Sequence, residues 1–346
     1  MYVVLFHALP WFEAHASLPG FVRTFVSNGY LAVAFFFLLS GFILAYSYEG
    51  NIAGKSNRAS FWKARFARIY PVYLLSLLLA LPWQPRLPLH VALPVLAMVQ
   101  AWNPLHPELT GAWNYPAWTL SVELFFYLCF PFLQGYLSGR SRRALMAYAA
   151  LAALLALVMH TPTQGLGHWD RSTFYGRYIP LSVLRIPDFI LGVALGNLFL
   201  SGKTCPRGAF VTVMAALATI LLLSIPIGQV VSLVIIPFAV LIYELASPSN
   251  RIGVLFSKRL MLLLGGASYS VYMLQSPFRD WVRILSTKLL RHGARFATPL
   301  TPVLLVLFSI LVFKFWEEPW RRSIRRWLKS DPKSAPAHTD LLFKGE

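Results

Sequence analysis

The stretch WTLSVELFFYLCFPFL, residues 118 to 133, carries a single charged side chain, the carboxylate of Glu123. The apolar run that contains it continues to about residue 138, and about 20 apolar residues are enough for a helix to cross a bilayer. The stretch is therefore typical of a membrane-spanning helix. Because an acid inside such a helix is costly, Glu123 is expected to face protein or a water-filled cavity.

The composition of the whole chain predicts a membrane protein. Of its 346 residues, 57% are apolar and 13% are charged, and the mean hydropathy is +0.58. These values exclude a soluble globular domain and a disordered chain. The net charge of +18 is spread over segments between apolar blocks, so nucleic acid is not expected as a partner. Cys129 and Cys205 lack the closely spaced ligands of a zinc site or disulfide framework, so no metal is expected.

Apolar runs with little internal charge predict an all-α polytopic protein of about ten transmembrane helices. The first helix, near the N-terminus, is expected to be truncated, because its apolar part ends at about Phe12, which leaves open a start upstream of Met1. The run at 91–102 is too short to cross and contains Pro94, so a re-entrant or interfacial segment is expected there. The other spans are expected at about 29–48, 69–84, 118–138, 143–160, 180–200, 209–225, 229–246, 260–277 and 299–316.

The basic residues predict the orientation of these helices. With both termini in the cytoplasm, the inner segments hold more than twice as many Lys and Arg residues as the outer segments. The exception is FRDWVRILSTKLLRHGARF, residues 278–296, which is predicted to form a separate amphipathic helix on the membrane surface. Residues 1–327 are expected to form one transmembrane domain, and residues 328–346 a polar, disordered cytoplasmic tail.

Thr119, Glu123 and Tyr127 recur at four-residue spacing, which places a hydroxyl, a carboxylate and a phenol on one helical face. An acid within a membrane span is by default a functional candidate. A purely structural role, as a hydrogen-bonded support between helices, explains the same pattern. Both interpretations stand at the level of sequence.

Two other polar features lie within predicted spans. Ser268, Tyr272 and Gln275 share one face of GGASYSVYMLQ, where they serve either helix packing or binding. His7 lies inside the apolar segment VVLFHALPW and is either a packing residue or a general base.

The segment RIPDFILGVALG, residues 185–196, combines charge with small residues. Arg185 and Asp188 are three residues apart and can neutralise each other within the bundle, which favours a structural ion pair. Gly192 and Gly196 form a small-residue face that allows close helix approach.

Arg65 and Arg68 share one helical face just before Pro71, where their guanidinium groups can bind phosphates bidentately. Anchoring of a cytoplasmic helix end explains them equally well. The chain contains no P-loop, nucleophile elbow, HExxH or H-x4-D motif, so any catalysis must combine residues from several helices.

One ordered set of segments runs along the chain: His7, GYLAVAFFFLLSGFIL (29–44), FWKARFARIYPVY (61–73), NYPAWTLSVELFFYLCFP (114–131), RIPDFILGVALG (185–196), ASYSVYMLQSPF (267–278) and EEPWRR (317–322). Taken in order, these segments resemble the membrane-bound acyltransferase-3 family, in its stand-alone form without an appended soluble domain. Two positions depart from the family pattern: the arginine usually found about eleven residues before the first-helix histidine is absent, and Gln275 stands where a histidine is usual.

The resemblance implies an O-acyltransferase of the bacterial inner membrane. It would move an acyl group, usually acetyl, from cytoplasmic acyl-CoA, a co-substrate rather than a bound cofactor, to a hydroxyl of a cell-surface, exopolysaccharide or lipid-linked sugar. Arg65 and Arg68 would bind the CoA phosphates, His7 would act as general base, and Glu123 would orient His7, with an acyl-histidine route as an alternative. Membrane lipids are expected as further partners, and the sequence leaves open whether the protein forms a homo-oligomer. The other candidate site-lining residues are Ser40, Trp118, Ser121, Tyr127, Arg185, Asp188, Tyr269, Tyr272 and Gln275.

Two other classes fit part of the sequence. A transporter or flippase of a sugar-lipid or small polar solute would use Arg185, Asp188 and Glu123 along a substrate pathway, although no inverted repeat supports it. A non-catalytic membrane scaffold explains the hydrophobicity but gives the arginine pair and the buried acid no role.

Overall fold

The computed structural model describes residues 2–15, 18–49, 52, 54–84, 88–160, 178–202, 208–226, 232–289 and 294–329. Within these ranges the regular elements are all helical, which confirms the predicted all-α class. The principal helices are α1 (Tyr2–His15), α2 (Gly20–Ser27), α3 (Ala32–Ser47), α4 (Lys55–Ala80), α5 (Leu89–Leu96), α6 (Trp118–Leu137), α7 (Arg142–His160), α9 (Leu181–Leu200), α10 (Ala209–Leu223), α12 (Ile235–Leu245), α13 (Arg251–Phe256), α14 (Arg259–Leu289), α15 (Ala294–Val312), the π-helix η7 (Phe313–Glu317) and α16 (Glu318–Lys329).

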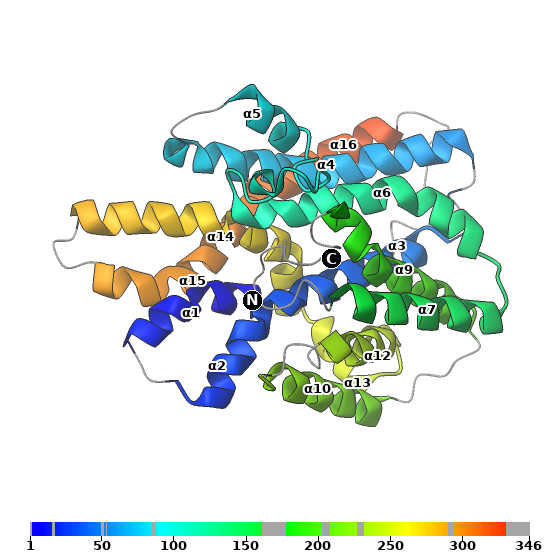
Figure 1. Cartoon of the computed structure of the whole chain (residues 1–346). Helices are drawn as coiled ribbons and strands as arrows, with labels where there is room; N and C mark the ends of the chain where they lie inside the picture. The colour runs from blue at the N-terminus through cyan, green and yellow to red at the C-terminus, as the bar shows by residue number, and fades with distance from the viewer. Residues whose placement is uncertain are drawn as a thin grey trace.

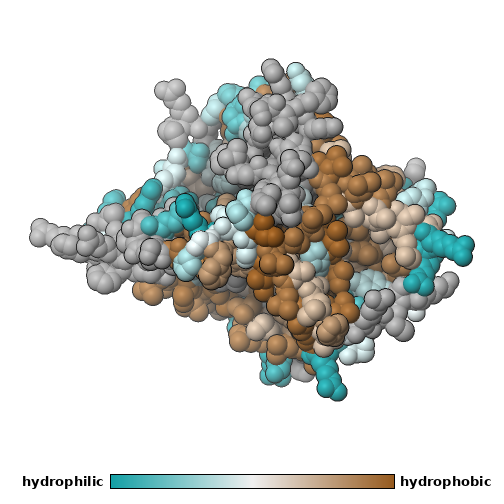
Figure 2. All heavy atoms as spheres, turned by 60° about the horizontal axis from the view of Figure 1, so that its bottom comes forward, coloured by the Kyte–Doolittle hydropathy of each residue, from teal (hydrophilic) through white to brown (hydrophobic). Residues whose placement is uncertain are grey.

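Six helical segments in the described part of the chain are long and apolar enough to cross a membrane. They are Gly20–Ser47, Asn57–Trp83, Tyr115–Leu137, Arg142–Met159, Leu181–Leu200 and Leu300–Ser323, and two shorter apolar helices cover Ala209–Leu223 and Ser232–Leu245. The outer surface agrees with this assignment, because Figure 2 shows broad apolar areas with polar side chains toward their margins. On α10, Phe210 and Leu221 are 72% and 64% exposed, as expected for side chains that face lipid.

The centre of the molecule is the contact between α3 and α9, which is made possible by glycine. A Cβ atom added to Gly41 would lie 2.3 Å from the carbonyl oxygen of Phe189, and one added to Gly192 would lie 2.0 Å from that of Leu38. Gly196 likewise faces α3. The predicted small-residue face is therefore confirmed, and α3 and α9 approach backbone to backbone.

The helix α4 is longer than predicted. It begins at Lys55 rather than near residue 69, because the basic residues assigned to an inner loop are good helix formers and continue the apolar helix toward the aqueous side. Arg65 and Arg68 are therefore helical, as their proposed common face requires.

The amphipathic helix predicted at 278–296 does not begin as a new element at residue 278. Residues up to Leu289 belong to α14, a single helix of 31 residues that begins at Arg259 and continues through Pro277. The sequence changes from apolar to amphipathic within α14, which is why a new helix was expected there. Trp281 keeps the amphipathic part of α14 packed on α4. Its indole nitrogen donates to the carbonyl oxygen of Leu79 at 3.0 Å.

The short segment predicted at 91–102 consists of α5 and a turn that folds back onto α6. The backbone nitrogen of Ala101 donates to Oγ of Ser121 at 3.1 Å, and the indole of Trp102 donates to the Ser121 carbonyl oxygen at 2.8 Å. The expected tail is helical as far as Lys329, and residues 330–346 lie outside the described residues.

The helices α4, α6 and α16 lie along one side of the molecule in Figure 1, with α14, α15 and α1 gathered beside one end of this layer. The helix α16 packs on α4, and α3 contacts both α6 and α9. The polar side chains of α3, α4, α6 and α14 meet inside this arrangement.

Candidate active site

The Glu123 carboxylate lies inside the bundle, where it is 3% exposed. Its Oε1 atom accepts a hydrogen bond from Oγ of Ser40 on α3 at 3.1 Å, and a short one from the hydroxyl of Tyr127, one turn later on α6. The predicted polar face of α6 therefore points inward. These hydroxyl donors offset part of the cost of burying the acid.

The predicted arginine pair lies beside this carboxylate. Both Arg65 and Arg68 interact electrostatically with Glu123. A guanidinium nitrogen of Arg65 donates to the Tyr48 hydroxyl at 3.2 Å, and its Nε atom is buried without a hydrogen-bond partner in the described structure. The side chain of Arg68 is exposed. The pair thus combines a half-buried cation, whose Nε is fully buried, with one that is exposed to solvent.

A second buried carboxylate, Glu317 in η7, was missed by the sequence analysis. It is 2% exposed, accepts from Oγ of Ser270 at 2.8 Å, and lies 3.6 Å from a guanidinium nitrogen of Arg321. Arg68 also interacts electrostatically with Glu317, so it lies between two buried acids. The sequence feature that could have identified Glu317 is its position as an acid directly after the apolar run 299–316.

Two side chains fix the helices around this charged layer. The Tyr269 hydroxyl donates to the carbonyl oxygen of Ile69 at 2.5 Å, which joins α14 to α4. The indole of Trp62 donates to the carbonyl oxygen of Tyr127 at 2.9 Å, which joins α4 to α6. Tyr269, a predicted site-lining residue, also interacts electrostatically with Glu123.

His7 lies toward the other end of the same face of α6. Its ring is 6.3 Å from the ring of Tyr115, at an interplanar angle of 84°, and it interacts electrostatically with Arg279. In the described structure it makes no hydrogen bond to Glu123, so the expected contact between base and orienting acid is not formed. The reason is distance: Tyr115 lies in the short 3₁₀ turn Tyr115–Ala117 that leads into α6, about 12 Å from Glu123 along the helix axis.

Tyr272 and Gln275 lie between these two ends. Tyr272 is hydrogen-bonded to Thr119, which is one turn before Glu123, and also lies near Tyr115. Gln275 is 6% exposed, and neither its Nε2 nor its Oε1 atom has a hydrogen-bond partner in the described structure. The site therefore extends along α6, with charge at one end and His7 at the other.

Other predicted lining residues have structural contacts. Ser121 holds the turn after α5 through the two bonds described above, and Trp118 packs edge-on against Phe37 at 6.3 Å. Arg185 interacts electrostatically with Asp188, as predicted, and with Tyr30. These residues surround the polar axis, and none of their described contacts reaches Glu123.

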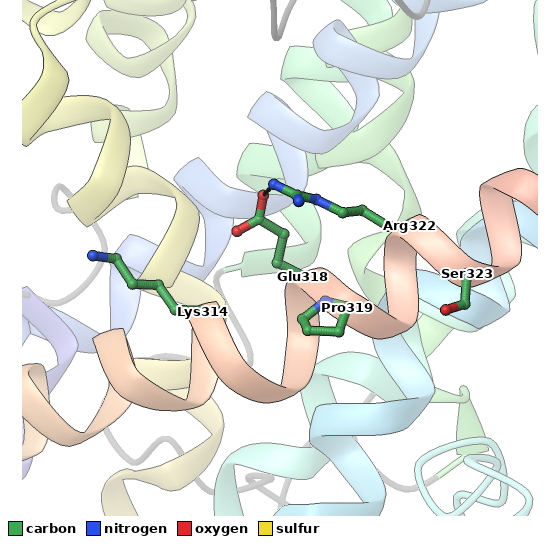
Figure 3. Close-up of a pocket in the computed structure, with 5 residues that line it drawn as sticks. All are labelled: Lys314, Glu318, Pro319, Arg322 and Ser323. Atoms are coloured by element: carbon green, nitrogen blue, oxygen red, sulfur yellow. Dashed lines mark hydrogen bonds and ion pairs between the residues drawn. The ribbon is translucent and has the colours of Figure 1, made fainter. Parts of the chain in front are cut away.

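A separate cavity of about 240 Å³ lies along η7 and α16 (Figure 3). Glu318 and Arg322 point toward one another across it and form an ion pair at 2.5 Å. Lys314, Pro319 and Ser323 complete its lining. Within the described ranges, no group of three His, Cys, Asp or Glu side chains has the arrangement of a metal site.

Comparison with known proteins identifies the family. A model of the acyltransferase domain matches residues 1–316. The acyltransferase MdmB of Streptomyces mycarofaciens is 30% identical over 240 residues, which cover 63% of this chain and 60% of MdmB. Protein 2 in the picA locus of Rhizobium radiobacter is 44% identical over 69 residues, which cover 20% of this chain and 36% of that protein.

No solved structure matches the chain significantly. The match to each of the two relatives covers less than two thirds of the relative's length. The family model, by contrast, covers His7, both arginines, Glu123 and Gln275. This chain therefore belongs to the acyltransferase-3 family.

Proposed function

We propose that this chain is an integral membrane O-acyltransferase that moves an acyl group, specifically acetyl, from cytoplasmic acyl-CoA to a hydroxyl of a cell-surface, exopolysaccharide or lipid-linked sugar. Family membership supports acyl transfer. The observation that carries the finer proposal is the two-ended polar site along α6, which suits a charged donor at one end and a polar acceptor at the other.

The donor end is the layer that contains Arg65 and Arg68. Acyl-CoA brings clustered phosphates, and guanidinium groups bind phosphate oxygens bidentately. The exposed Arg68 is available for the first contact, while the unpaired Nε of Arg65 offers a donor deeper in the bundle. Glu123 and Glu317 hold these cations in place, so Glu123 is assigned a positioning role toward the donor end rather than toward His7.

The acceptor end contains His7. A neutral imidazole can remove the proton of a hydroxyl as the oxygen attacks a carbonyl carbon. The tyrosine and threonine hydroxyls between the two ends, Tyr272 and Thr119, give the narrow arm of CoA polar neighbours along its path. This arrangement brings the thioester toward His7 while the phosphates stay near the arginines.

The reaction then breaks one bond and forms one. The acceptor oxygen attacks the thioester carbonyl carbon and gives its proton to His7. The tetrahedral intermediate collapses, its C–S bond breaks, and the CoA thiolate takes the proton back from His7. The products are an ester and free CoA, and direct transfer requires no acyl-enzyme.

The decisive experiment is acetyl transfer by purified protein in lipid nanodiscs, with radiolabelled acetyl-CoA and sugar-lipid acceptors. His7→Ala should lower the transfer rate roughly a hundredfold or more, since a general base contributes about that much. The matched control is His90→Ala, because His90 is an exposed histidine on α5 away from the polar axis. Equal activity of His7→Ala and wild type would eliminate His7 as the base, and no transfer by wild type with any acceptor would contradict the proposed function.

A further inference from the structure

Gln275 is a polar side chain without a structural explanation. It is 6% exposed, and both polar atoms of its amide lack a partner within the described structure. Buried amides are nearly always hydrogen-bonded, because leaving a buried polar group unpaired destabilises the fold. A partner that is absent from the resting protein, such as a bound substrate, would satisfy this amide.

The position of Gln275 follows from its neighbours on α14. Tyr272, three residues earlier, is hydrogen-bonded to Thr119 of α6. Arg279, four residues later, interacts electrostatically with His7 of α1. Residues at these spacings share one helical face. Gln275 therefore lies between the α6 contact and the His7 contact.

The packing of α1 against α14 places Gln275 at the same depth in the bundle as His7. Val4 belongs to one buried cluster with Val271 and Leu274, and α1 contacts α14 directly. His7 is about one turn beyond Val4 on α1, and Gln275 immediately follows Leu274 on α14. Two independent sets of contacts thus place the unpaired amide at the depth of the imidazole.

We propose that Gln275 is a catalytic residue whose Nε2 group donates a hydrogen bond to the carbonyl oxygen of the acyl thioester and to the oxyanion that forms there. This inference rests on the proposed acyl transfer. When the acceptor oxygen attacks the carbonyl carbon and His7 takes its proton, the carbonyl π electrons move onto the oxygen. The amide donor stabilises that charge until the C–S bond breaks and the thiolate recovers the proton.

This role explains why the amide is left unpaired in the resting protein. A donor that is already oriented and dehydrated needs no reorganisation when the charge develops, so its interaction is stronger in the transition state than in the ground state. A partner within the protein would compete with the substrate. The unpaired state is thus the arrangement that a preorganised oxyanion donor requires.

The test compares Gln275→Met with Gln134→Met. Methionine keeps the length and approximate volume of glutamine but removes both polar atoms. Gln134 is a buried glutamine with partners: it donates to Oδ1 of Asn197 at 3.2 Å and accepts from its Nδ2 at 2.9 Å. For each variant, kcat and KM for acetyl-CoA and the melting temperature would be measured in nanodiscs.

We expect Gln275→Met to lower kcat roughly 100- to 1,000-fold, as loss of one oxyanion donor does elsewhere. Its KM for acetyl-CoA should change little, and its Tm should stay the same or rise because an unpaired buried amide is removed. Gln134→Met should do the reverse, with a lower Tm and wild-type kcat. Gln275→Asn, which keeps the donor but withdraws it by one methylene, should have an intermediate kcat.

Three results would overturn the inference: an unchanged kcat in Gln275→Met, a change in KM alone, or a lower Tm that accounts for the lost activity as lost folded protein. An inactive wild-type protein would instead count against acyl transfer itself. In that case the two Tm values would still show whether Gln275 is paired within the fold.

Discussion

At the scale of single residues, Glu123 is a buried acid held among hydroxyl and guanidinium groups. Its described partners are the Ser40 and Tyr127 hydroxyls and the nearby guanidinium groups of Arg65 and Arg68. A carboxylate in this position accepts from the hydroxyls and attracts both cations at once. Under the proposed function, its contribution is therefore the placement and charge balance of the donor end.

Glu123→Gln keeps the size of the side chain but removes its charge. We expect the protein to insert and fold while acyl transfer falls roughly 10- to 100-fold, because hydrogen bonds and contacts to a charged group are worth about 1.5 to 3 kcal/mol. Most of this loss should be an increase in the KM for acetyl-CoA, with kinetics measured in nanodiscs. Glu49→Gln, at an exposed glutamate, is the control. Wild-type kinetics in Glu123→Gln would reduce the acid to a packing residue.

At the scale of helices, the contact of α3 with α9 carries much of the architecture around the site. Ser40 is next to Gly41 in sequence, so the separation of α3 from α9 also decides where the Ser40 hydroxyl meets Glu123. A side chain at Gly41 or Gly192 would not fit in this contact. The positions of α3 and α9 relative to each other therefore depend on these glycines.

Gly192→Ala tests this contact. Its added methyl would lie 2.0 Å from the Leu38 carbonyl oxygen, so the helices must move apart, at a cost of about 1 to 3 kcal/mol. We expect a lower Tm in nanodiscs and reduced transfer. Gly135→Ala on α6, where nothing lies within 4 Å of the added atom, should leave Tm unchanged or raise it. Similar Tm values for the two variants would show that α3 and α9 do not need their close approach.

At the scale of the whole molecule, the sequence predicted the helical class, the inward face of α6 and the common face of Arg65 and Arg68, but not that this pair lies beside Glu123. The predictions of helical class and inward face are correct because a backbone in the membrane must satisfy its own hydrogen bonds, which favours helices. Charged side chains in the membrane must also face the protein interior. The sequence did not predict the separation of His7 from Glu123 or the unpaired state of Gln275. Those depend on the register between helices far apart in sequence, which periodicity within one helix does not contain.

The predicted orientation, with both termini in the cytoplasm, can be tested in cells. After Cys129 and Cys205 are replaced by alanine, single cysteines would be placed at Ser141, between α6 and α7, and at Lys288, near the end of α14. Both positions are exposed. A membrane-impermeant maleimide should label Lys288→Cys in intact spheroplasts and Ser141→Cys only after permeabilisation. The opposite pattern would invert the assigned topology.

The π-helix at Phe313–Glu317 makes this part of the chain tolerant of a change in length. A π turn covers nearly the same rotation as an α turn but holds one residue more, so removing one residue there would restore α-helix and leave α16 in nearly the same orientation. A one-residue deletion within the α-helical part of α15 would instead rotate every later side chain by about 100°. Phe315 is 76% exposed, so its loss would remove little buried contact. Relatives that are one residue shorter at this point should therefore still place the counterparts of Glu317 and Arg321 in the layer that contains Arg68.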